Sequence, residues 1–227
     1  MTEAPTGTFD LTRPFTFVAD DPRWLQKILV GGVVNFLMLV LIGIPLIFGY
    51  LARLARNVAR GEAKPLPEWD EWGRDFGEGL SLAVIGLIYF IPVILLFIFT
   101  IGGSAVVGAM TDAAFEDGSP LAGGLFGIGA CFGYLLALIV SVILPAALTR
   151  AVMLERFGAA FELGAILPYI SANLGNYVIS ILIHLVASFL ANFGVALLCV
   201  GAFFTGFWAF TVTTFAFAET WRFSRVK

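Results

Sequence analysis

The chain has 227 residues, of which 59% are hydrophobic and 13% are charged, and its formal net charge is −3. Soluble globular domains average roughly 45–50% apolar and about 25% charged residues, so the composition excludes an ordinary soluble enzyme. The acidic balance also excludes nucleic acid as a partner, because such binding needs clustered positive charge. Two cysteines and one histidine leave no cluster for a zinc or haem site, and we expect no metal and no cofactor.

The N-terminal residues 1–27 are polar and mixed, and we interpret them as an interfacial segment with Trp24 and Lys27 near the lipid headgroups. The first apolar run, 28–48, carries no charge and is long enough to cross a hydrocarbon core of roughly 30 Å. Gly43-Ile44-Pro45 breaks this run near its end. The break allows either a kinked span or a re-entrant segment.

Three more apolar regions predict the remaining membrane helices. The segments 80–101 and 123–148 each predict one helix, and 177–218 is long enough for two helices joined by a tight turn. The intervening segments are an amphipathic cytoplasmic loop (49–79), an acidic extracytoplasmic loop (102–122), an amphipathic cytoplasmic segment (149–176) and a basic cytoplasmic tail (219–227). The sequence therefore predicts an all-α integral membrane protein, a bundle of four to five transmembrane helices with interfacial amphipathic helices.

Loop charges predict the orientation of the chain. Segments 49–79 and 149–176 and the tail carry lysine and arginine, whereas 102–122 carries only acidic charges, so the positive-inside rule places the C-terminus in the cytoplasm. Five full crossings would place the three basic residues of the N-terminal segment outside. Four crossings with a re-entrant first run would keep every basic residue inside. Both arrangements stay open at this point.

Several short motifs resemble a known family of membrane proteins. The motifs are Asp21-Pro22-Arg23-Trp24, Lys27-Ile28-Leu29, Gly31-Gly32, Pro45-Leu-x-x-Gly-Tyr with the arginines up to Arg56, Gly61-Glu62, Leu66-Pro67-Glu68-Trp69-Asp70-Glu71-Trp72-Gly73 and Leu198-Cys199-Val200-Gly201. Together they resemble the prokaryotic domain-of-unknown-function family 4013, over nearly the whole chain. The resemblance implies a polytopic protein of a bacterial or archaeal inner membrane and implies no particular activity.

A row of polar residues at four-residue spacing marks the first half of 177–218. The row consists of Asn176, Ser180, His184, Ser188 and Asn192, and Asn35 is a further amide inside the first apolar run. Ionisable groups at this depth often mark function, so the row could line a water path, a proton route or a substrate cavity. The competing interpretation is interhelical hydrogen bonding, which needs no pathway.

Two further patterns indicate packing and charge. Gly123, Gly127, Gly129 and Gly133 form two Gly-x-x-x-Gly pairs, which allow close helix approach within the chain or in a dimer. Arg53, Arg56 and Arg60 lie along one side of a predicted helix, a geometry that suits contact with anionic lipid headgroups. The residues Glu68, Asp70, Glu71, Arg74 and Asp75, which we call the clamp, suggest a nearly neutral cytoplasmic latch.

These patterns favour a non-enzymatic integral membrane component that acts as an oligomer or as an accessory subunit of a larger assembly. Its expected partners are membrane lipids and either further copies of itself or other membrane proteins. A small transporter or channel, with its pathway along Ser180, His184 and Ser188, is the alternative. A lipid-modifying enzyme is a third and weaker interpretation, because no nucleophile elbow, metal triad or phosphate-binding loop is present.

Overall fold

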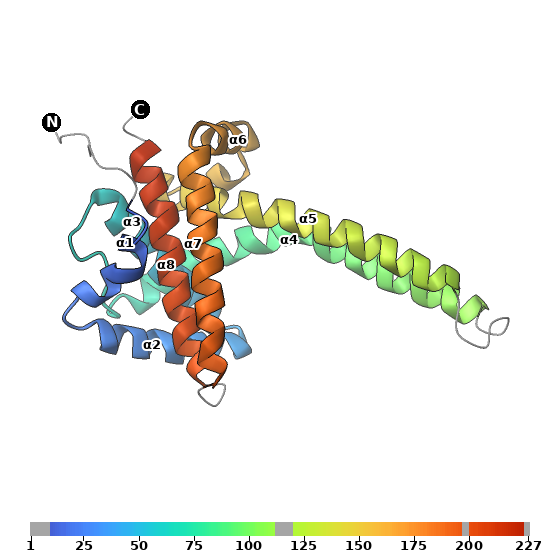
Figure 1. Ribbon diagram of the computed structural model, residues 1–227, viewed down its shortest axis with the longest axis horizontal. Coiled ribbons are helices and arrows are strands. Elements are labelled where there is room, and N and C mark those ends of the chain that lie inside the picture. The colour runs from blue at the N-terminus through green and yellow to red at the C-terminus, as the bar shows by residue number, and fades with distance from the viewer. Residues whose placement is uncertain (1–9, 112–119, 197–199, 225–227) are drawn as a thin grey trace. The chain divides into compact units, whose positions relative to one another are not determined.

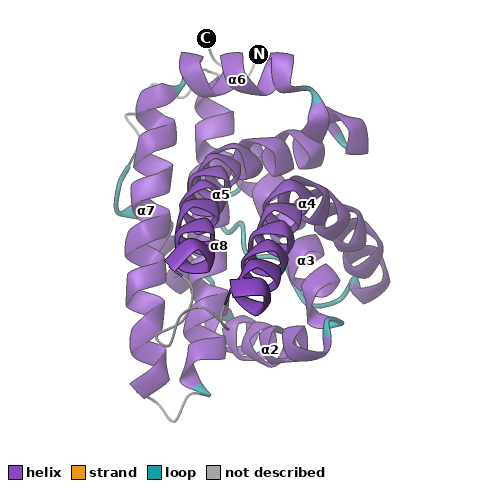
Figure 2. Ribbon diagram, turned by 90° about the vertical axis from the view of Figure 1, so that its right-hand side faces the viewer, coloured by secondary structure: helices purple, strands orange, loops and turns teal. Residues whose placement is uncertain are grey.

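The structure is a computed structural model that describes residues 10–111, 120–196 and 200–224. The α-helices are α1 (Arg13–Thr16), α2 (Trp24–Phe36), α3 (Gly43–Arg60), α4 (Trp72–Thr111), α5 (Pro120–Leu154), α6 (Leu163–Ala172), α7 (Leu174–Asn192) and α8 (Gly201–Ser224). Short 3-10 helices lie at Phe17–Asp20, Leu37–Val40, Phe157–Phe161 and Phe193–Ala196. The described part of the chain contains no strand (Figures 1 and 2), so the predicted all-α class is confirmed.

The chain divides into two compact units. The bundle unit comprises the residues up to Ile85 together with those from Pro145 onward, and the hairpin unit is Gly86–Leu144. Four helices are long and apolar enough to cross a membrane, namely α4, α5, Leu174–Ala196 and α8. A fifth crossing would require a bent pair of helices, Arg13–Asp20 and Trp24–Val40, to act as one span. These counts fit the predicted bundle of four to five membrane helices.

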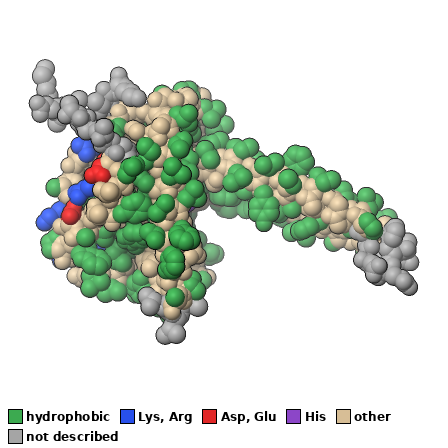
Figure 3. Space-filling view, viewed as in Figure 1, with side chains coloured by type: hydrophobic (Ala, Val, Ile, Leu, Met, Phe, Trp, Pro, Cys, Tyr) green, Lys and Arg blue, Asp and Glu red, His purple; other side chains and the backbone are tan. Residues whose placement is uncertain are grey.

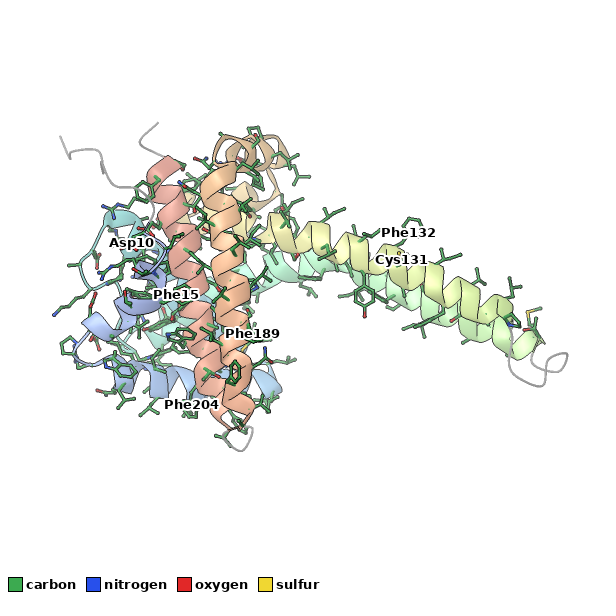
Figure 4. The ribbon with its side chains drawn as sticks, in the orientation of Figure 1. Asp10, Phe15, Cys131, Phe132, Phe189 and Phe204 are labelled. Atoms are coloured by element: carbon green, nitrogen blue, oxygen red, sulfur yellow. The ribbon has the colours of Figure 1, made fainter. Side chains whose placement is uncertain are left out.

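Helix α8 forms the centre of the bundle unit and packs against α2, α3 and α7 (Figure 1). Two glycines of α2 permit this contact, since a Cβ atom on Gly31 would lie 2.0 Å from the Phe207 ring and one on Gly32 would lie 2.1 Å from Phe204. Phe204 thus lies directly over α2 (Figure 4). The adjacent Gly31-Gly32 pair therefore provides a close seat for two aromatic rings of α8.

The first apolar run is divided into two helices. The backbone turns at Leu41, which has a left-handed φ of 65°, and α3 starts two residues later at Gly43. The break therefore lies just before the predicted Gly43–Pro45 motif, and Pro45 falls in the first turn of α3, where its missing N–H carries little cost. A Cβ atom on Gly43 would lie 2.3 Å from the Val34 carbonyl oxygen, so the start of α3 packs closely on α2.

The hairpin unit consists of parts of α4 and α5 that pack side by side. A Cβ atom on Gly129 would lie 2.2 Å from the Thr100 side chain, and one on Gly133 would lie 2.8 Å from the Phe97 ring. Most other large side chains of the unit are exposed and apolar, including Phe132, which projects from α5 next to Cys131 (Figure 4). The acidic loop predicted at 102–122 is shorter in the structure, because 102–111 continue α4 and 120–122 begin α5, while 112–119 lie outside the described residues.

Candidate functional site

Charged side chains of the bundle unit gather at the start of α2, along α3 and at the start of α4. We call this group the charged cluster, and its members are Asp21, Lys27, Arg53, Arg56, Glu68, Asp70, Asp75 and Glu78. On the face drawn in Figure 3, the visible charged side chains lie together in one area, and the rest of the described surface is drawn as hydrophobic or other atoms. The charged cluster and the cavities beside it are therefore the candidate functional site of the bundle unit.

Helices α3 and α4 cross in direct backbone contact, which brings the two sides of the cluster together. A Cβ atom on Gly49 would lie 2.0 Å from the Asp75 carbonyl oxygen, and one on Gly79 would lie 1.7 Å from the Pro45 carbonyl oxygen. Only glycine leaves room for this approach. The crossing places the first turns of α4 beside the arginines of α3.

Arg53 is buried against Asp75, whose side chain is fully buried. The Arg53 guanidinium donates to Asp75 at 2.6 Å, to Asp70 at 3.1 Å and to the Glu68 carbonyl oxygen at 2.7 Å. Burial acts to lower the pKa of Arg53, but the hydrogen bond and charge of Asp75 outweigh it and raise that pKa. Burial raises the pKa of Asp75. Among the described residues Arg53 Nε and Asp75 Oδ1 are buried without a hydrogen-bond partner, so the pair is incompletely satisfied.

Arg56 forms a second, partly buried pair with Glu78, one turn further along both helices. Both guanidinium nitrogens donate to the carboxylate, one of them at 2.7 Å, in a two-pronged arrangement. The hydrogen bond to Glu78 raises the pKa of Arg56 against the opposing effect of burial. Arg60, one turn on, is exposed and lies only 3.6 Å from Glu62.

Lys27 and Asp21 complete the cluster at the start of α2. The buried Lys27 ammonium donates to Asp21 at 2.6 Å and lies 2.7 Å from Glu68. Burial acts to raise the pKa of Asp21, but the bonds from Lys27 and from the Arg23 N–H lower it overall. An ion pair therefore links the N-terminal segment to the loop that follows α3.

Side chains also hold this loop by its backbone. Backbone carbonyl oxygens of the loop accept three bonds: Leu66 from Lys27 Nζ at 2.9 Å, Pro67 from Tyr50 Oη at 3.0 Å, and Pro65 from Asn57 Nδ2 at 2.9 Å. In the other direction, Trp69 Nε1 of the loop donates to the Lys27 carbonyl oxygen at 3.0 Å. The Tyr50 and Trp69 rings stack with centroids 4.1 Å apart, and burial raises the pKa of Tyr50. The loop is thus fixed between α2 and α3.

The structure distributes the predicted clamp residues over these contacts. Asp70 and Asp75 bind Arg53, Glu68 binds Lys27 and Arg23, and Glu71 binds Arg74 at 2.7 Å. The arginines predicted to meet lipid headgroups differ among themselves, because Arg53 and Arg56 face inward while the Arg60 side chain is 63% exposed. Contact with anionic lipid stays a prediction for Arg60.

The polar row joins helices to one another. Ser180 donates to the Ala216 carbonyl oxygen and contacts Thr220, which donates to the Asn176 carbonyl oxygen. The exposed His184 of α7 has its Nδ1 atom 3.0 Å from the hydroxyl of Thr213 on α8. Two of the amides bond to backbone, since Asn35 donates to Phe203 at 2.8 Å and Asn192 donates to Ser188 within α7. Ser188 is half-buried.

The four glycines of the predicted packing motifs face different surroundings. Gly129 and Gly133 contact α4, as described above. Gly123 and Gly127 have no heavy atom within 4 Å of the site that a Cβ would occupy, among the residues described. The surface at Gly123 and Gly127 is therefore not covered by any other described part of the chain.

Among the residues that the structure describes, three of the cavities border charged side chains of the bundle unit. The first, of about 450 Å³, lies beside Arg56, Glu78 and the end of α5 near Arg156. A second, of about 250 Å³, lies over the exposed side of the clamp, and a third, of about 170 Å³, lies between Arg13, Glu219 and Arg222. Within the described ranges, no group of three or more His, Cys, Asp or Glu side chains could hold a metal ion.

Comparison with models of known protein families shows to which family the chain belongs. A family model described as "Protein of unknown function (DUF4013)" matches residues 33–200, well over half of the chain. The chain belongs to the DUF4013 family. Comparison with curated proteins and with solved structures finds no match. The resemblance predicted from short motifs is thus confirmed, although the match begins after the Asp21–Gly32 motifs rather than including them.

The DUF4013 match includes only part of the charged cluster. It covers Arg53, Arg56 and all their partners on α4, but Asp21 and Lys27 lie outside it, as does Glu219 of the third cavity. The sequence reasoning did not single out these three residues as site residues. Lys27 and Asp21 are six positions apart, and nothing in their spacing indicates that they pair with each other or that Lys27 also lies beside Glu68.

Proposed function

We propose that this DUF4013 protein is a non-enzymatic integral membrane component that associates with further copies of itself, or as an accessory subunit with other membrane helices. The observation that carries the proposal is the length of its hairpin. The part of α4 that lies in the hairpin unit, from Gly86 to Thr111, carries no charge and is about 39 Å long at 1.5 Å per residue, longer than a hydrocarbon core of roughly 30 Å.

The apolar surface beyond the hydrocarbon core needs another cover, and α5 offers a suitable face. Gly123, Gly127 and the exposed Cys131 follow one another at four-residue spacing, and both glycines are open to a close approach. Small residues at this spacing allow helix backbones to pack tightly in a membrane. This face therefore supports self-association through α5.

The two other functions considered have less support from the contacts. Ser180 and Asn35 donate hydrogen bonds to backbone carbonyl oxygens of α8. These bonds support a packing role for the polar row more than a transport pathway along it. The carboxylates of the clamp are paired with basic side chains, which supports a latch more than acid–base chemistry. We further propose a prokaryotic inner-membrane location with a cytoplasmic C-terminus, on the loop charges.

The test is disulfide formation through the native Cys131 in bilayers, in a chain that carries Cys199→Ser. Mild oxidation is expected to link two copies, and Gly127→Ile is expected to reduce the linked fraction by at least about tenfold by separating the helices. Gly102→Ile is the matched control, because Gly102 on α4 is equally open to its surroundings. Equal crosslinking in both variants, or a monomeric chain in nanodiscs, would contradict self-association.

A further inference from the structure

The smallest of the three cavities lies where α1, the end of α3 and the last turns of α8 meet. Its volume is about 170 Å³, and it is lined by Arg13, Val58, Gly61, Glu62, Ala63, Phe215, Glu219 and Arg222. Neither the polar row nor the clamp contributes to it. It is therefore a separate candidate site within the bundle unit.

Glu219 is the buried acid of this cavity. The residue is 8% exposed, and its Oε2 atom is buried without a hydrogen-bond partner. A carboxylate removed from water without a partner is costly, so such a group usually has a ligand or a counter-ion in the working protein. No ion pair joins Glu219 to a basic side chain in the described part of the chain.

Arg222 supplies a guanidinium to the same cavity. Its Nη2 atom lies so close to the end of α3 that a Cβ on Gly61 would be 2.9 Å away. Among the described residues no carboxylate lies within 4.0 Å of Arg222. Arg222 and Glu219 thus line one cavity without closing on each other.

The remaining charges around the cavity already have partners. Arg13 is paired with Asp20 and lies 3.4 Å from the Ala63 carbonyl oxygen. Glu62 lies 3.6 Å from Arg60, and Asp10, next to α1 (Figure 4), accepts bonds from Thr12 at 2.8 and 2.9 Å. Among the described residues that line the cavity, the carboxylate of Glu219 and the guanidinium of Arg222 are left without an ionic partner.

We propose that this cavity binds a zwitterionic ligand that carries a primary ammonium and a phosphate a few bonds apart. The ammonium donates to Glu219, and the phosphate accepts from Arg222, with charge-assisted hydrogen bonds on both sides. A simple anion would meet the repulsion of Glu219, and a simple cation would leave Arg222 unpaired. The chemistry is that of a phosphoethanolamine group, either on a membrane lipid or as a soluble compound.

The lipid source is tested by native mass spectrometry of the full chain released from nanodiscs that hold equal amounts of phosphatidylethanolamine and phosphatidylcholine. We expect at least about tenfold preferential retention of phosphatidylethanolamine, because a quaternary ammonium cannot donate a hydrogen bond to Glu219. Glu219→Gln and Arg222→Gln are each expected to abolish the preference. Glu71→Gln and Arg74→Gln, an exposed pair that loses the same charges, are expected to retain it.

The soluble source is tested by titrating O-phosphoethanolamine, ethanolamine and inorganic phosphate into the detergent-solubilised protein. Saturable binding of O-phosphoethanolamine alone, lost in Arg222→Gln, would support the site and assign it to a soluble ligand if the lipid preference is absent. No preference in either experiment, or a preference unchanged in both cavity variants, would overturn the proposal and leave a hydrated cavity only. If Glu219→Gln fails to fold, Arg222→Gln decides the result.

Discussion

Arg53 and Arg56 are held inside the bundle unit by carboxylates of α4, whereas Arg60 on the same helix is exposed. Burying a guanidinium is costly unless a charge and hydrogen bonds compensate for it, and Asp75 and Glu78 provide both. The cost explains why these arginines occur with nearby acids on the next helix. At the residue scale the charged cluster is therefore a latch between α3 and α4, and Lys27 attaches the start of α2 to the loop that joins them.

The Asp21–Lys27 pair gives a pH prediction. Because the folded-state pKa of Asp21 lies below its ordinary value of 3.8, ionised Asp21 stabilises the fold above that value, and this stabilisation is lost as the pH falls through the folded-state pKa. We expect Asp21→Asn to lower the free energy of unfolding by about 1.5–3 kcal/mol at neutral pH. The difference from the unmodified protein should shrink below pH 3.8.

The measurement is the free energy of unfolding in detergent, at steps of about one pH unit between roughly pH 3 and pH 7, a range that includes the ordinary pKa of a carboxyl group. Asp20→Asn is the control, because the Asp20 side chain is 45% exposed in its pair with Arg13 and surface pairs contribute little. A difference for Asp21→Asn that stays constant over the whole range would contradict the argument.

At the scale of elements, glycines determine where helices touch. Gly31 and Gly32 admit the rings of α8, Gly49 and Gly79 admit backbone, and Gly129 admits Thr100. Membrane helices lack a hydrophobic driving force between them and depend on such close contacts. The α3–α4 crossing is the most demanding case, because backbone atoms cannot move aside as the end of a side chain can.

Gly79→Ala and Gly77→Ala form a matched test of this crossing. A Cβ on Gly79 would lie 1.7 Å from the Pro45 carbonyl oxygen, whereas nothing lies within 4 Å of the same position at Gly77. We expect Gly79→Ala to destabilise the protein by about 1–3 kcal/mol through strain at the crossing. Gly77→Ala should be neutral or stabilise α4 by up to about 1 kcal/mol. Thermal unfolding in detergent is the measurement, and equal effects of the two substitutions would refute the crossing.

At the scale of the whole molecule, the contacts of Lys27 bear on how the first apolar run sits in the membrane. The start of α2 is bonded to the loop after α3, through Lys27 to Leu66 and Trp69 to Lys27. Between these points the backbone turns at Leu41. Two ends held together by direct bonds lie on one side of a bilayer, which favours the re-entrant arrangement over a full crossing.

Cysteine labelling tests this arrangement. In a chain with Cys131 and Cys199 replaced by serine, Thr12→Cys and Lys64→Cys are expected to react with a membrane-impermeant maleimide only from the cytoplasmic side. Ser119→Cys, in the acidic loop predicted to lie outside, serves as the opposite-side control. Labelling of Thr12→Cys and Lys64→Cys from different sides would show a full crossing.

The sequence by itself determined the all-α membrane class, the positions of four long apolar helices and the family. These properties depend on local composition, because an uncharged run longer than the hydrocarbon core requires helix whatever its neighbours are. The break in the first run was also predictable to within a few residues, since Gly43 and Pro45 mark it. Motifs sufficed for the family because they are contiguous.

Only the tertiary structure decided which polar residues meet. Arg53, Arg56 and Arg60 have similar spacing, and nothing local distinguishes the buried two from the exposed one. The contact of Lys27 with Glu68 joins segments far apart along the chain, and so does the cavity that Glu219 and Arg222 share with Arg13 and Gly61. Whether a charged side chain is buried and paired depends on its neighbours in space. Helix periodicity therefore predicted which residues share a polar face, but only the packing of the helices determined their partners.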